Sequence, residues 1–295
     1  MNGGFKVPDF PDTTSPRVLR SIFEQLGLSP RRQWGQNFLI DANVARKIVA
    51  ALDEIPGRNV IEVGPGAGAL TAVLSQKGYR ILALEIDRGL ADFLQQNLMG
   101  QEAVQIRQAD ALKIKWQDLL SADFKGSRPK LISNLPYVIS GPFLFSLLKE
   151  KFPFSASILM LQKEVALRLV ASPGDHDYGA LSVLCRYYTR GRVLFDVSPH
   201  VFWPKPKVGS SVILLLPRRP ILAPEAEPLF WTLVQGVFQQ RRKTMLKSLA
   251  RLLPVSREEL GGFLSATGIE PGARPEELNV EQFAKLTAII YNKQQ

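Results

Sequence analysis

The stretch from Leu131 to Tyr137 ends an apolar run with an amide, a proline and an aromatic ring. The exocyclic amine of adenine is a poor nucleophile because its lone pair is delocalised into the ring. The Asn134 side-chain oxygen and the Pro136 carbonyl can accept hydrogen bonds from such an amine and hold its lone pair toward an electrophilic methyl group. Tyr137 can stack on a base taken out of its helix. These residues predict methyl transfer to an exocyclic amine, with no strongly basic residue required.

The alternative for this loop is a plain turn, since Asn and Pro both favour turns. Its position argues against that, because it follows the third predicted strand after a glycine-rich loop at residues 60–71. Glycines such as Gly64 and Gly66 let a backbone turn sharply and approach a ligand with no Cβ in the way. Tight strand-to-helix turns also use glycine for steric reasons alone, so the loop needs support from its neighbours.

That support comes from two acids at predicted strand ends. Glu85 follows Gly64 by 21 residues and can accept hydrogen bonds from ribose hydroxyls. Asp110 ends the strand after that, although an acid there could equally cap a helix. Both acids suit a nucleoside, which S-adenosylmethionine and the nicotinamide cofactors share. The spacing Glu-x-Gly-x-Gly-x-Gly departs from the G-x-G-x-x-G of dinucleotide sites and favours S-adenosylmethionine over a nicotinamide-dependent oxidoreductase.

Seven short apolar runs predict strands, and several lie between amphipathic helical stretches, as in a mostly parallel sheet covered on both faces. The runs are Val60–Val63, Ile81–Leu84, Val104–Ile106, Leu131–Ser133, Ser157–Leu161, Val193–Val197 and Val212–Leu216. Four prolines, Pro217, Pro220, Pro224 and Pro228, then mark a linker. We expect an N-terminal arm with a short helix over residues 1–30, a catalytic α/β domain over 31–217 and a helical RNA-binding domain over 218–295.

The composition narrows the class of protein. The formal charge of +10 favours a polyanionic partner. Cys185 is the only cysteine, so a disulfide framework is excluded and a reducing compartment is indicated. With His176 and His200 as the only histidines, neither a Cys/His metal site nor a Ser-His-Asp arrangement is supported. No apolar run approaches the ~20 residues of a membrane span, so we expect a cytoplasmic protein.

Taken together, the motifs resemble the KsgA family of ribosomal RNA adenine dimethyltransferases from about residue 35 to residue 286, most closely its bacterial small-subunit members. Besides the two loops, the matching segments are 36–39, 85–87, 110–112, 162–166, 178–182, 202–210, 238–243 and 274–278. The resemblance implies a Rossmann-like class I methyltransferase fold with a seven-stranded sheet, a small C-terminal α-helical domain and S-adenosylmethionine as cofactor. It also implies dimethylation of the N6 amines of two adjacent adenosines near the 3′ end of 16S rRNA, with a role in small-subunit maturation.

The resemblance assigns roles to individual residues. Those implied to bind the cofactor are Asn37, Leu39, Gly64, Gly66, Glu85, Asp110 and Asn134. Phe202 is implied to sandwich the target adenine against Tyr137, although its own pattern would assign it to the core. Trp34 departs from the family, which more usually has small or basic residues at this position. The resemblance therefore does not define the entry to the cofactor pocket.

Between residues 201 and 255, nine Lys or Arg face two Glu, so this span carries +7 of the total +10. Five of these cations cluster on or beside one amphipathic helix: Arg241, Arg242, Lys243, Lys247 and Arg251. A solvated helix face would explain them, but their closeness to the proposed base-stacking motif favours phosphate contact. We therefore expect this domain to hold folded RNA by its backbone while the loop takes an unpaired base.

Two other functions stay open on sequence alone. One is a large-subunit ribosomal RNA dimethylase of the antibiotic-resistance type, which shares both loops. The other is a ribosome-assembly factor that acts mainly by binding, since binding and methylation need the same basic surface. The expected partner is the small ribosomal subunit and its rRNA, the protein is expected to be a monomer, and no metal or membrane is expected.

Overall fold

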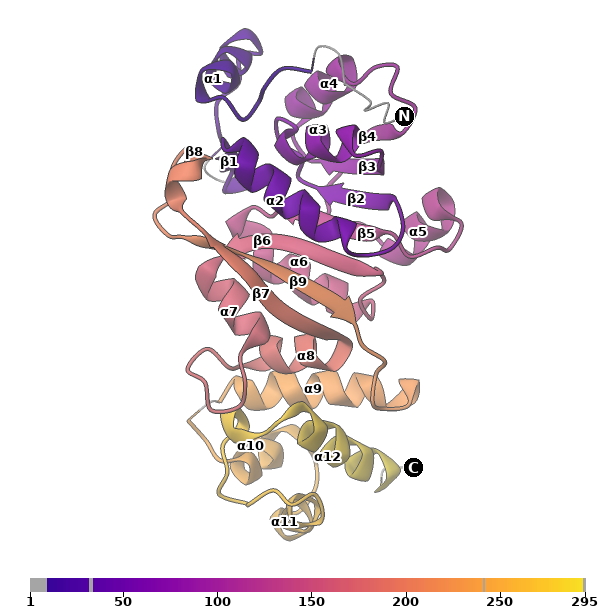
Figure 1. Cartoon of the computed structure of the whole chain (residues 1–295). Helices are drawn as coiled ribbons and strands as arrows, with labels where there is room; N and C mark the ends of the chain where they lie inside the picture. The colour runs from indigo at the N-terminus through magenta and orange to yellow at the C-terminus, as the bar shows by residue number, and fades with distance from the viewer. Residues whose placement is uncertain (1–9, 32–33, 241, 294–295) are drawn as a thin grey trace. The chain divides into compact units, whose positions relative to one another are not determined.

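The computed structural model describes residues 10–31, 34–240 and 242–293 (Figure 1). Its strands are β1 (Phe38–Leu39), β2 (Asn59–Val63), β3 (Arg80–Glu85), β4 (Val104–Gln108), β5 (Lys130–Asn134), β6 (Ala156–Gln162), β7 (Thr189–Val197), β8 (Phe202–Trp203) and β9 (Ser210–Pro217). Its α-helices are α1 (Pro16–Gln25), α2 (Ala42–Asp53), α3 (Ala69–Gln76), α4 (Arg88–Asn97), α5 (Trp116–Phe124), α6 (Ser140–Lys149), α7 (Lys163–Val170), α8 (Ala180–Tyr188), α9 (Glu227–Phe238), α10 (Met245–Leu252), α11 (Arg257–Ala266) and α12 (Val280–Lys293).

Seven strands form one sheet in the order β4-β3-β2-β5-β6-β9-β7. The pairs β3–β4, β2–β3, β2–β5 and β5–β6 are parallel, and β9 runs antiparallel to β6. All seven predicted runs lie in this sheet, so the predicted α/β class is confirmed. A separate antiparallel ladder, which the sequence did not predict, pairs β1 with β8 and sets Leu39 opposite Phe202.

The sheet is apolar on both faces, as the long apolar runs predicted. Alternate strand residues such as Val60 and Ile132 pack in one cluster with Ile48 of α2 and Leu74 of α3. Residues between them, such as Ile61, point to the other face and are equally buried. A sheet with no polar face must be covered on both sides.

The described chain forms two compact units. The first comprises the residues up to Ala166 together with Arg192–Pro217; the second comprises Leu167–Gly191 and the chain from Arg218 to α12. One of the divisions between the two units falls after Pro217. Leu167–Gly191, expected in the α/β domain, instead groups with the helical unit, where α8 contacts α9 and α12. Pro228 lies in the first turn of α9 rather than in a linker, because proline is tolerated there.

Lys130, the first residue of β5, is a buried cation with only 1% of its surface exposed. Its Nζ donates to the carbonyl of Leu52, in the last turn of α2, at 2.7 Å, and to the carbonyl of Ile55 just beyond that helix. The last carbonyls of a helix have no partners within it, and a cation there also complements the helix dipole. Lys130 therefore caps α2 from the sheet that α2 covers.

Replacing this lysine should destabilise the first unit. Lys130→Met keeps the apolar stem but removes the Nζ donor from both carbonyls, of which that of Leu52 keeps the Ile55 N–H; this should cost about 1–3 kcal/mol. Urea unfolding followed by circular dichroism would measure the shift in midpoint. Lys149→Met, at an exposed lysine in the last turn of α6, is the matched control and should change stability by less than about 0.5 kcal/mol. Equal midpoints for the two variants would contradict this role of Lys130.

Candidate active site

The carboxyl ends of four neighbouring strands meet at one edge of the sheet. Strands β4, β3, β2 and β5 lie side by side and lead to Asp110, Glu85, the glycine loop and Asn134, respectively. The chain passes from β4 at one edge to β5 on the far side of β2, so its direction of winding reverses between β2 and β5. Open α/β sheets bind ligands at such a switch point.

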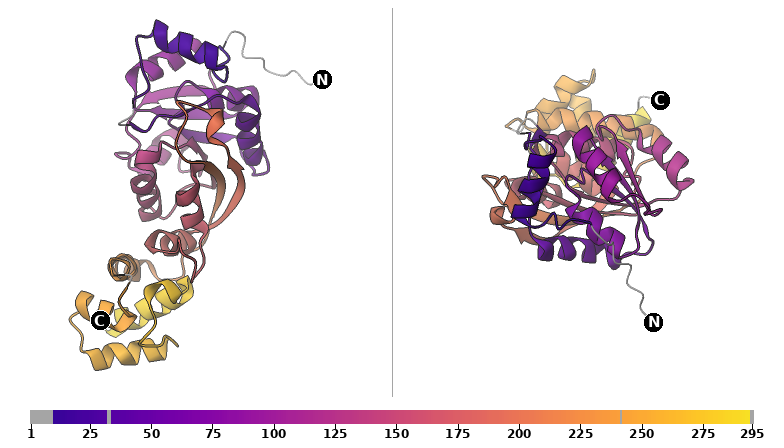
Figure 2. Two further views of the ribbon diagram at one scale, coloured as in Figure 1. Left: turned by 90° about the vertical axis from the view of Figure 1, so that its left-hand side faces the viewer. Right: turned by 90° about the horizontal axis from the view of Figure 1, so that it is seen from above.

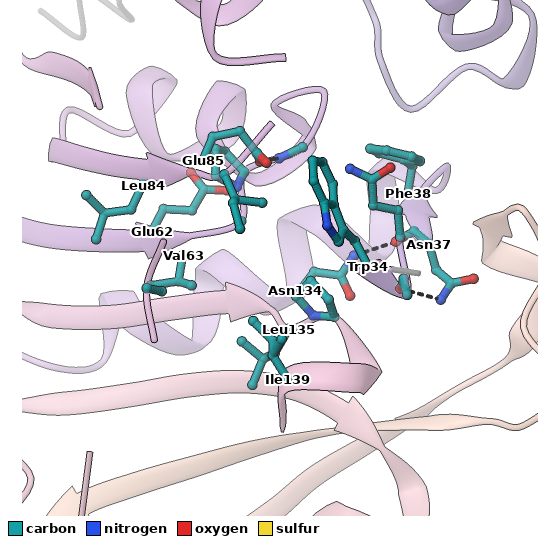
Figure 3. Close-up of a pocket in the computed structure, with 18 of the residues that line it drawn as sticks. Trp34, Asn37, Phe38, Glu62, Val63, Leu84, Glu85, Asn134, Leu135 and Ile139 are labelled. Carbon is teal, nitrogen blue, oxygen red and sulfur yellow. Dashed lines mark hydrogen bonds between the residues drawn. The ribbon is translucent and has the colours of Figure 1, made fainter. Parts of the chain in front are cut away.

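A cavity opens at this point (Figure 3). Of the predicted site residues in the first unit, all but Phe202 line it: Asn37, Leu39, Gly64, Gly66, Glu85, Asp110, Asn134, Pro136 and Tyr137. The structure thus brings together residues that lie almost 100 positions apart in the sequence.

The glycine loop needs its glycines for backbone geometry and for space. Gly64 and Gly66 both have positive φ, 65° and 60°, which side chains other than glycine rarely adopt. A Cβ on Gly66 would also lie 3.0 Å from the ring of Phe38. These constraints give the cavity a wall of bare backbone against which a ligand can lie.

Glu85 is held rigidly at the end of β3 with 3% of its surface exposed. Its Oε2 accepts a hydrogen bond from the Gly66 N–H and its Oε1 one from the Asp87 N–H, both at 2.9 Å. Burial raises the pKa of this carboxyl, while the two backbone donors lower it. A carboxylate has about four acceptor positions, so Glu85 can still accept from hydroxyl groups of a ligand.

Asp110 lines the cavity and also accepts a hydrogen bond within the turn that follows β4. Its Oδ1 accepts a hydrogen bond from the Leu112 N–H at 3.0 Å, and Lys113 lies 3.8 Å from its Oδ2. The helix cap that the sequence left open as an alternative is not seen, since the next helix begins only at Trp116; instead a local turn fixes the carboxylate at the cavity wall.

The Asn134 side chain is fixed by the N-terminal segment of the unit. Its Nδ2 donates to the Asn37 carbonyl at 2.9 Å, and the Asn37 Nδ2 donates in turn to the Gly35 carbonyl at 3.0 Å (Figure 3). Because only the nitrogen of an amide can donate, these bonds decide which way the Asn134 amide faces. Its Oδ1 is left as an acceptor at the cavity.

The structure argues against the acceptor role predicted for Pro136. Its carbonyl already accepts the Ile139 N–H at 3.1 Å and the Ser140 hydroxyl at 3.2 Å, and a carbonyl has two lone pairs. These bonds start the short helix at Tyr137–Ile139, so they belong to the turn itself. Within the described chain the neighbouring Leu135 carbonyl accepts no hydrogen bond, and Leu135 also lines the cavity.

The hydroxyl of Tyr137 forms a hydrogen bond with Ser210, the first residue of β9, with 2.6 Å between the two oxygens. Burial raises the pKa of this phenol, so it remains a neutral hydrogen-bonding group. Ser210 entered the sequence argument only as the end of a matching segment. Its position opposite Tyr137 shows that it orients the ring.

Phe202 is not brought to the cavity. It is 3% exposed and packs in the core cluster with Leu39 and Val212. Its strand, β8, pairs with β1, and this ladder turns the ring inward, as the pattern of its own sequence suggested. The stacking of Phe202 on a base opposite Tyr137 is therefore not present in this arrangement.

The cavity is also lined by Thr13, which the sequence analysis did not single out, and by Trp34, which it noted only as a departure from the family. Thr13 is 2% exposed, although the N-terminal arm was expected to be loose. The reason lies in α1, the dark indigo helix of Figure 2. Its Phe23 packs with Phe38 in one cluster, and its Ile22 packs against Phe93 of α4 in another. The helical spacing of the apolar residues in α1 was the available signal.

The predicted RNA-binding residues lie in the second unit. Arg242 and Lys243 are exposed ahead of α10, and Lys247 is exposed on that helix. Arg241 lies outside the described residues. Among the residues described, no three His, Cys, Asp or Glu are grouped to hold a metal ion. No described helix is long and apolar enough to cross a membrane.

This fold and site define a class I methyltransferase. The fold recurs in a dimethyladenosine transferase from Plasmodium falciparum, with a TM-score of 0.70 at 23% identity over 87% of this chain and 98% of that one. It also recurs in the 23S rRNA methyltransferase ErmE, with a TM-score of 0.63 at 25% identity over 85% and 98% of the two chains.

The profile of the ribosomal RNA adenine dimethylase family matches residues 27–292. A protein of Pelotomaculum thermopropionicum named ribosomal RNA small subunit methyltransferase A is 43% identical, over 92% of this chain and 95% of that one. One of the same name from Moorella thermoacetica is 41% identical, over 94% and 98%. The chain belongs to the ribosomal RNA adenine dimethylase family. The predicted enzyme class, an rRNA adenine dimethyltransferase, is thereby confirmed.

Glu62 of β2 is an acid buried beneath the glycine loop, with 1% of its surface exposed. Its Oε2 accepts the Thr71 hydroxyl of α3 at 2.7 Å. Burial, opposed by this hydrogen bond, raises the pKa of Glu62 from its ordinary value of 4.5 to about 8, and the nearby Glu85 charge acts in the same direction as burial.

This shift predicts a pH-dependent stability. The unfolded chain releases the Glu62 proton near pH 4.5, whereas the folded protein keeps it until about pH 8. The contribution of Glu62 to the free energy of unfolding is therefore fully present below pH 4.5 and is lost as the pH rises to about 8. Glu62→Gln should remove this loss and gain roughly 2–5 kcal/mol relative to wild type between these limits.

Unfolding in urea at a series of pH values would measure this difference. The same substitution at exposed Glu102 is the control and should leave the wild-type pH profile unchanged. A constant difference between Glu62→Gln and wild type from pH 5 to pH 9 would contradict a buried proton at this position.

Proposed function

We propose that the protein dimethylates the N6 amines of two adjacent adenosines near the 3′ end of 16S rRNA, with S-adenosylmethionine as methyl donor, during maturation of the small ribosomal subunit. The observation that carries the proposal is the Asn134 amide, turned by Asn37 so that its oxygen faces a cavity walled by bare glycine backbone. The name shared by the relatives points to the small subunit. We expect the enzyme to act as a monomer in the cytoplasm.

The cavity residues suit an S-adenosylmethionine molecule. Glu85 would accept the ribose hydroxyls, Asp110 would lie at the adenine, and Gly64 and Gly66 would let the donor approach the backbone. Asn37 and Leu39 would close over it. Bound there, the donor supplies a methyl group activated by a positively charged sulfur. The cavity provides space for the donor beside this bare backbone.

The loop after β5 would present the target amine to that methyl group. We assign the two acceptors to the Asn134 Oδ1 and the Leu135 carbonyl, because the Pro136 carbonyl is occupied by its own turn. Accepting both N–H groups draws the amine out of the plane of the ring and directs its lone pair at the methyl carbon. Tyr137, oriented by Ser210, would stack on the base. The proton released after transfer can pass to water, so no strong base is needed.

The acceptor role predicts a large loss of rate in Asn134→Ala. With radiolabelled S-adenosylmethionine and small subunits lacking their adenosine dimethylation, we expect label in dimethyladenosine with wild type and a rate lower by about 10²-fold or more with the variant. Asn292→Ala, at an exposed asparagine of α12, is the control and should transfer at the wild-type rate.

The same assay separates the remaining functions. Transfer to naked large-subunit RNA but not to small subunits would assign the enzyme to the resistance type. If Asn134→Ala is inactive yet still supports subunit assembly, the essential function is binding. Undiminished transfer by Asn134→Ala would contradict the proposed role of the loop.

We further propose that the second unit binds RNA phosphates through Arg242, Lys243 and Lys247, together with Arg241. The three described side chains are exposed and closely spaced, and no acid lies among residues 228–257 to offset them. Each Lys or Arg that neutralises a phosphate contributes about −0.7 to −0.9 to the slope of log K against log salt concentration.

Changing Arg242, Lys243 and Lys247 together to Ala should weaken RNA binding and make that slope shallower by about 2. Filter binding of the RNA from 50 to 300 mM salt would measure it. The matched control changes Lys125, Arg128 and Lys149, exposed cations at the opposite end of the sheet from the cavity, and should keep the wild-type slope. A wild-type slope in the first variant would contradict phosphate binding at this surface.

A further inference from the structure

Trp34 lines the cavity, and neither the sequence nor the family suggests a role for it. Its side chain is half-buried and lines the cavity with Glu85 and Asn134. Figure 3 shows its indole projecting into the cavity, between the strand ends that carry Glu85 and Asn134 and the segment of Asn37 and Phe38. A large aromatic surface is therefore presented to whatever the cavity binds.

The indole is held in place by Arg31. The Arg31 guanidinium lies 4.3 Å from the centre of the Trp34 ring, and the backbone N–H of Trp34 donates to the backbone carbonyl of Arg31 at 3.0 Å. The Arg31 Nε lies 3.4 Å from the Asp87 Oδ2, so the charge of the arginine is balanced by a buried acid. Gln36 adds a further tie, since its Oε1 accepts the Arg31 N–H at 2.8 Å.

These contacts join Trp34 to the turn that is proposed to bind ribose. Asp87 donates its N–H to Glu85 and caps α4 with its side chain, which accepts the N–H groups of Gly89 and Leu90. The indole, Arg31, Asp87 and Glu85 therefore form one connected set, of which Trp34 and Glu85 line the cavity. These contacts restrict movement of the ring.

If the proposed function holds, the sulfur of the donor lies between the ribose at Glu85 and the methyl group at Asn134, which is the part of the cavity that Trp34 lines. Aromatic faces attract cations, and tryptophan does so most strongly. The sulfur is positively charged in S-adenosylmethionine and neutral in S-adenosylhomocysteine. We propose that Trp34 contacts the sulfonium and makes the site prefer the donor over its demethylated product.

This preference would serve an enzyme that transfers two methyl groups to each base. After each transfer the neutral product must leave and a fresh donor must enter. A ring that binds the cation but gains little from the thioether favours that exchange. The carboxylates of Glu85 and Asp110 also favour a cation, and they are unchanged in a Trp34 variant, so the contribution of the ring can be measured separately.

The test is equilibrium binding to the full chain without RNA. Isothermal titration calorimetry would give the dissociation constants of S-adenosylmethionine and S-adenosylhomocysteine for wild type, Trp34→Leu and Trp34→Phe. We expect the preference for the donor to fall by roughly three- to tenfold in Trp34→Leu and to be largely kept in Trp34→Phe, which retains a ring.

Trp203→Leu is the matched control. Trp203 packs on Phe23 and Phe38 in the same part of the unit but does not line the cavity. Its loss should change both dissociation constants by the same factor. Trp34→Gln, a polar replacement suited to a half-exposed position, provides the measurement if Trp34→Leu does not fold.

An equal weakening of donor and product in the Trp34 variants would overturn the proposal and make the ring a simple wall of the pocket. Unchanged binding of both would overturn it as well. If wild type binds neither compound, the proposed function fails and the inference fails with it. If wild type binds both compounds and the Trp34 variants keep its preference for the donor, the inference is wrong but the proposed function stands.

Discussion

The hydrogen bond from the Asn134 amide to the Asn37 carbonyl determines how the active site is arranged. It joins the end of β5 to a segment almost 100 residues earlier in the chain, and it decides that the oxygen of the amide faces the cavity. It also places Asn37 and Phe38 beside the glycine loop, where the Phe38 ring sets the limit of approach at Gly66. Without this bond the amide could turn over and present a donor to an amine that needs acceptors.

The two residues after Asn37 are held in place by packing with other parts of the unit. Phe38 contacts Phe23 of α1, with ring centres 4.9 Å apart, and Leu39 pairs with Phe202 across the ladder of β1 and β8. The N-terminal helix and the last strands of the unit are thus both anchored on the two residues that follow Asn37. The ring of Phe202 is needed in the core for this purpose, which explains why it does not reach the cavity.

The sequence predicted the parts of the site that depend on local rules. Glu85, Asp110 and Asn134 follow apolar strands, and the carboxyl ends of parallel strands meet at one edge, so their convergence could be inferred without coordinates. The backbone carbonyl that would accept the second hydrogen bond of the amine was harder to predict. Only the turn geometry shows that the Pro136 carbonyl already accepts hydrogen bonds from Ile139 and Ser140.

Contacts between segments remote in sequence account for the other differences. Thr13 lines the cavity just before α1, which packs against α4 and the glycine loop. Trp34 lines it beside Arg31, which contacts Asp87. No local pattern specifies these contacts. In the same way, residues 167–191 have the alternating pattern of the catalytic domain, yet α8 contacts α9 and α12. Secondary structure followed from local patterns here, whereas the allocation of helices to units did not.

The balance of charge in the cavity bears on how such an enzyme can be efficient. In the proposed complex, Glu85, Asp110 and the Trp34 ring would all favour a cation, and methyl transfer would remove the positive charge from the sulfur of the donor. Groups that bind the charged donor better than the transition state would slow the chemical step, since only interactions that strengthen toward the transition state accelerate it. Under the proposed function, their benefit would therefore lie in the exchange of product for donor. The acceleration would come from the other side of the methyl group, where the Asn134 Oδ1 would be held in place before the amine arrives and would interact more strongly as that amine gains positive charge.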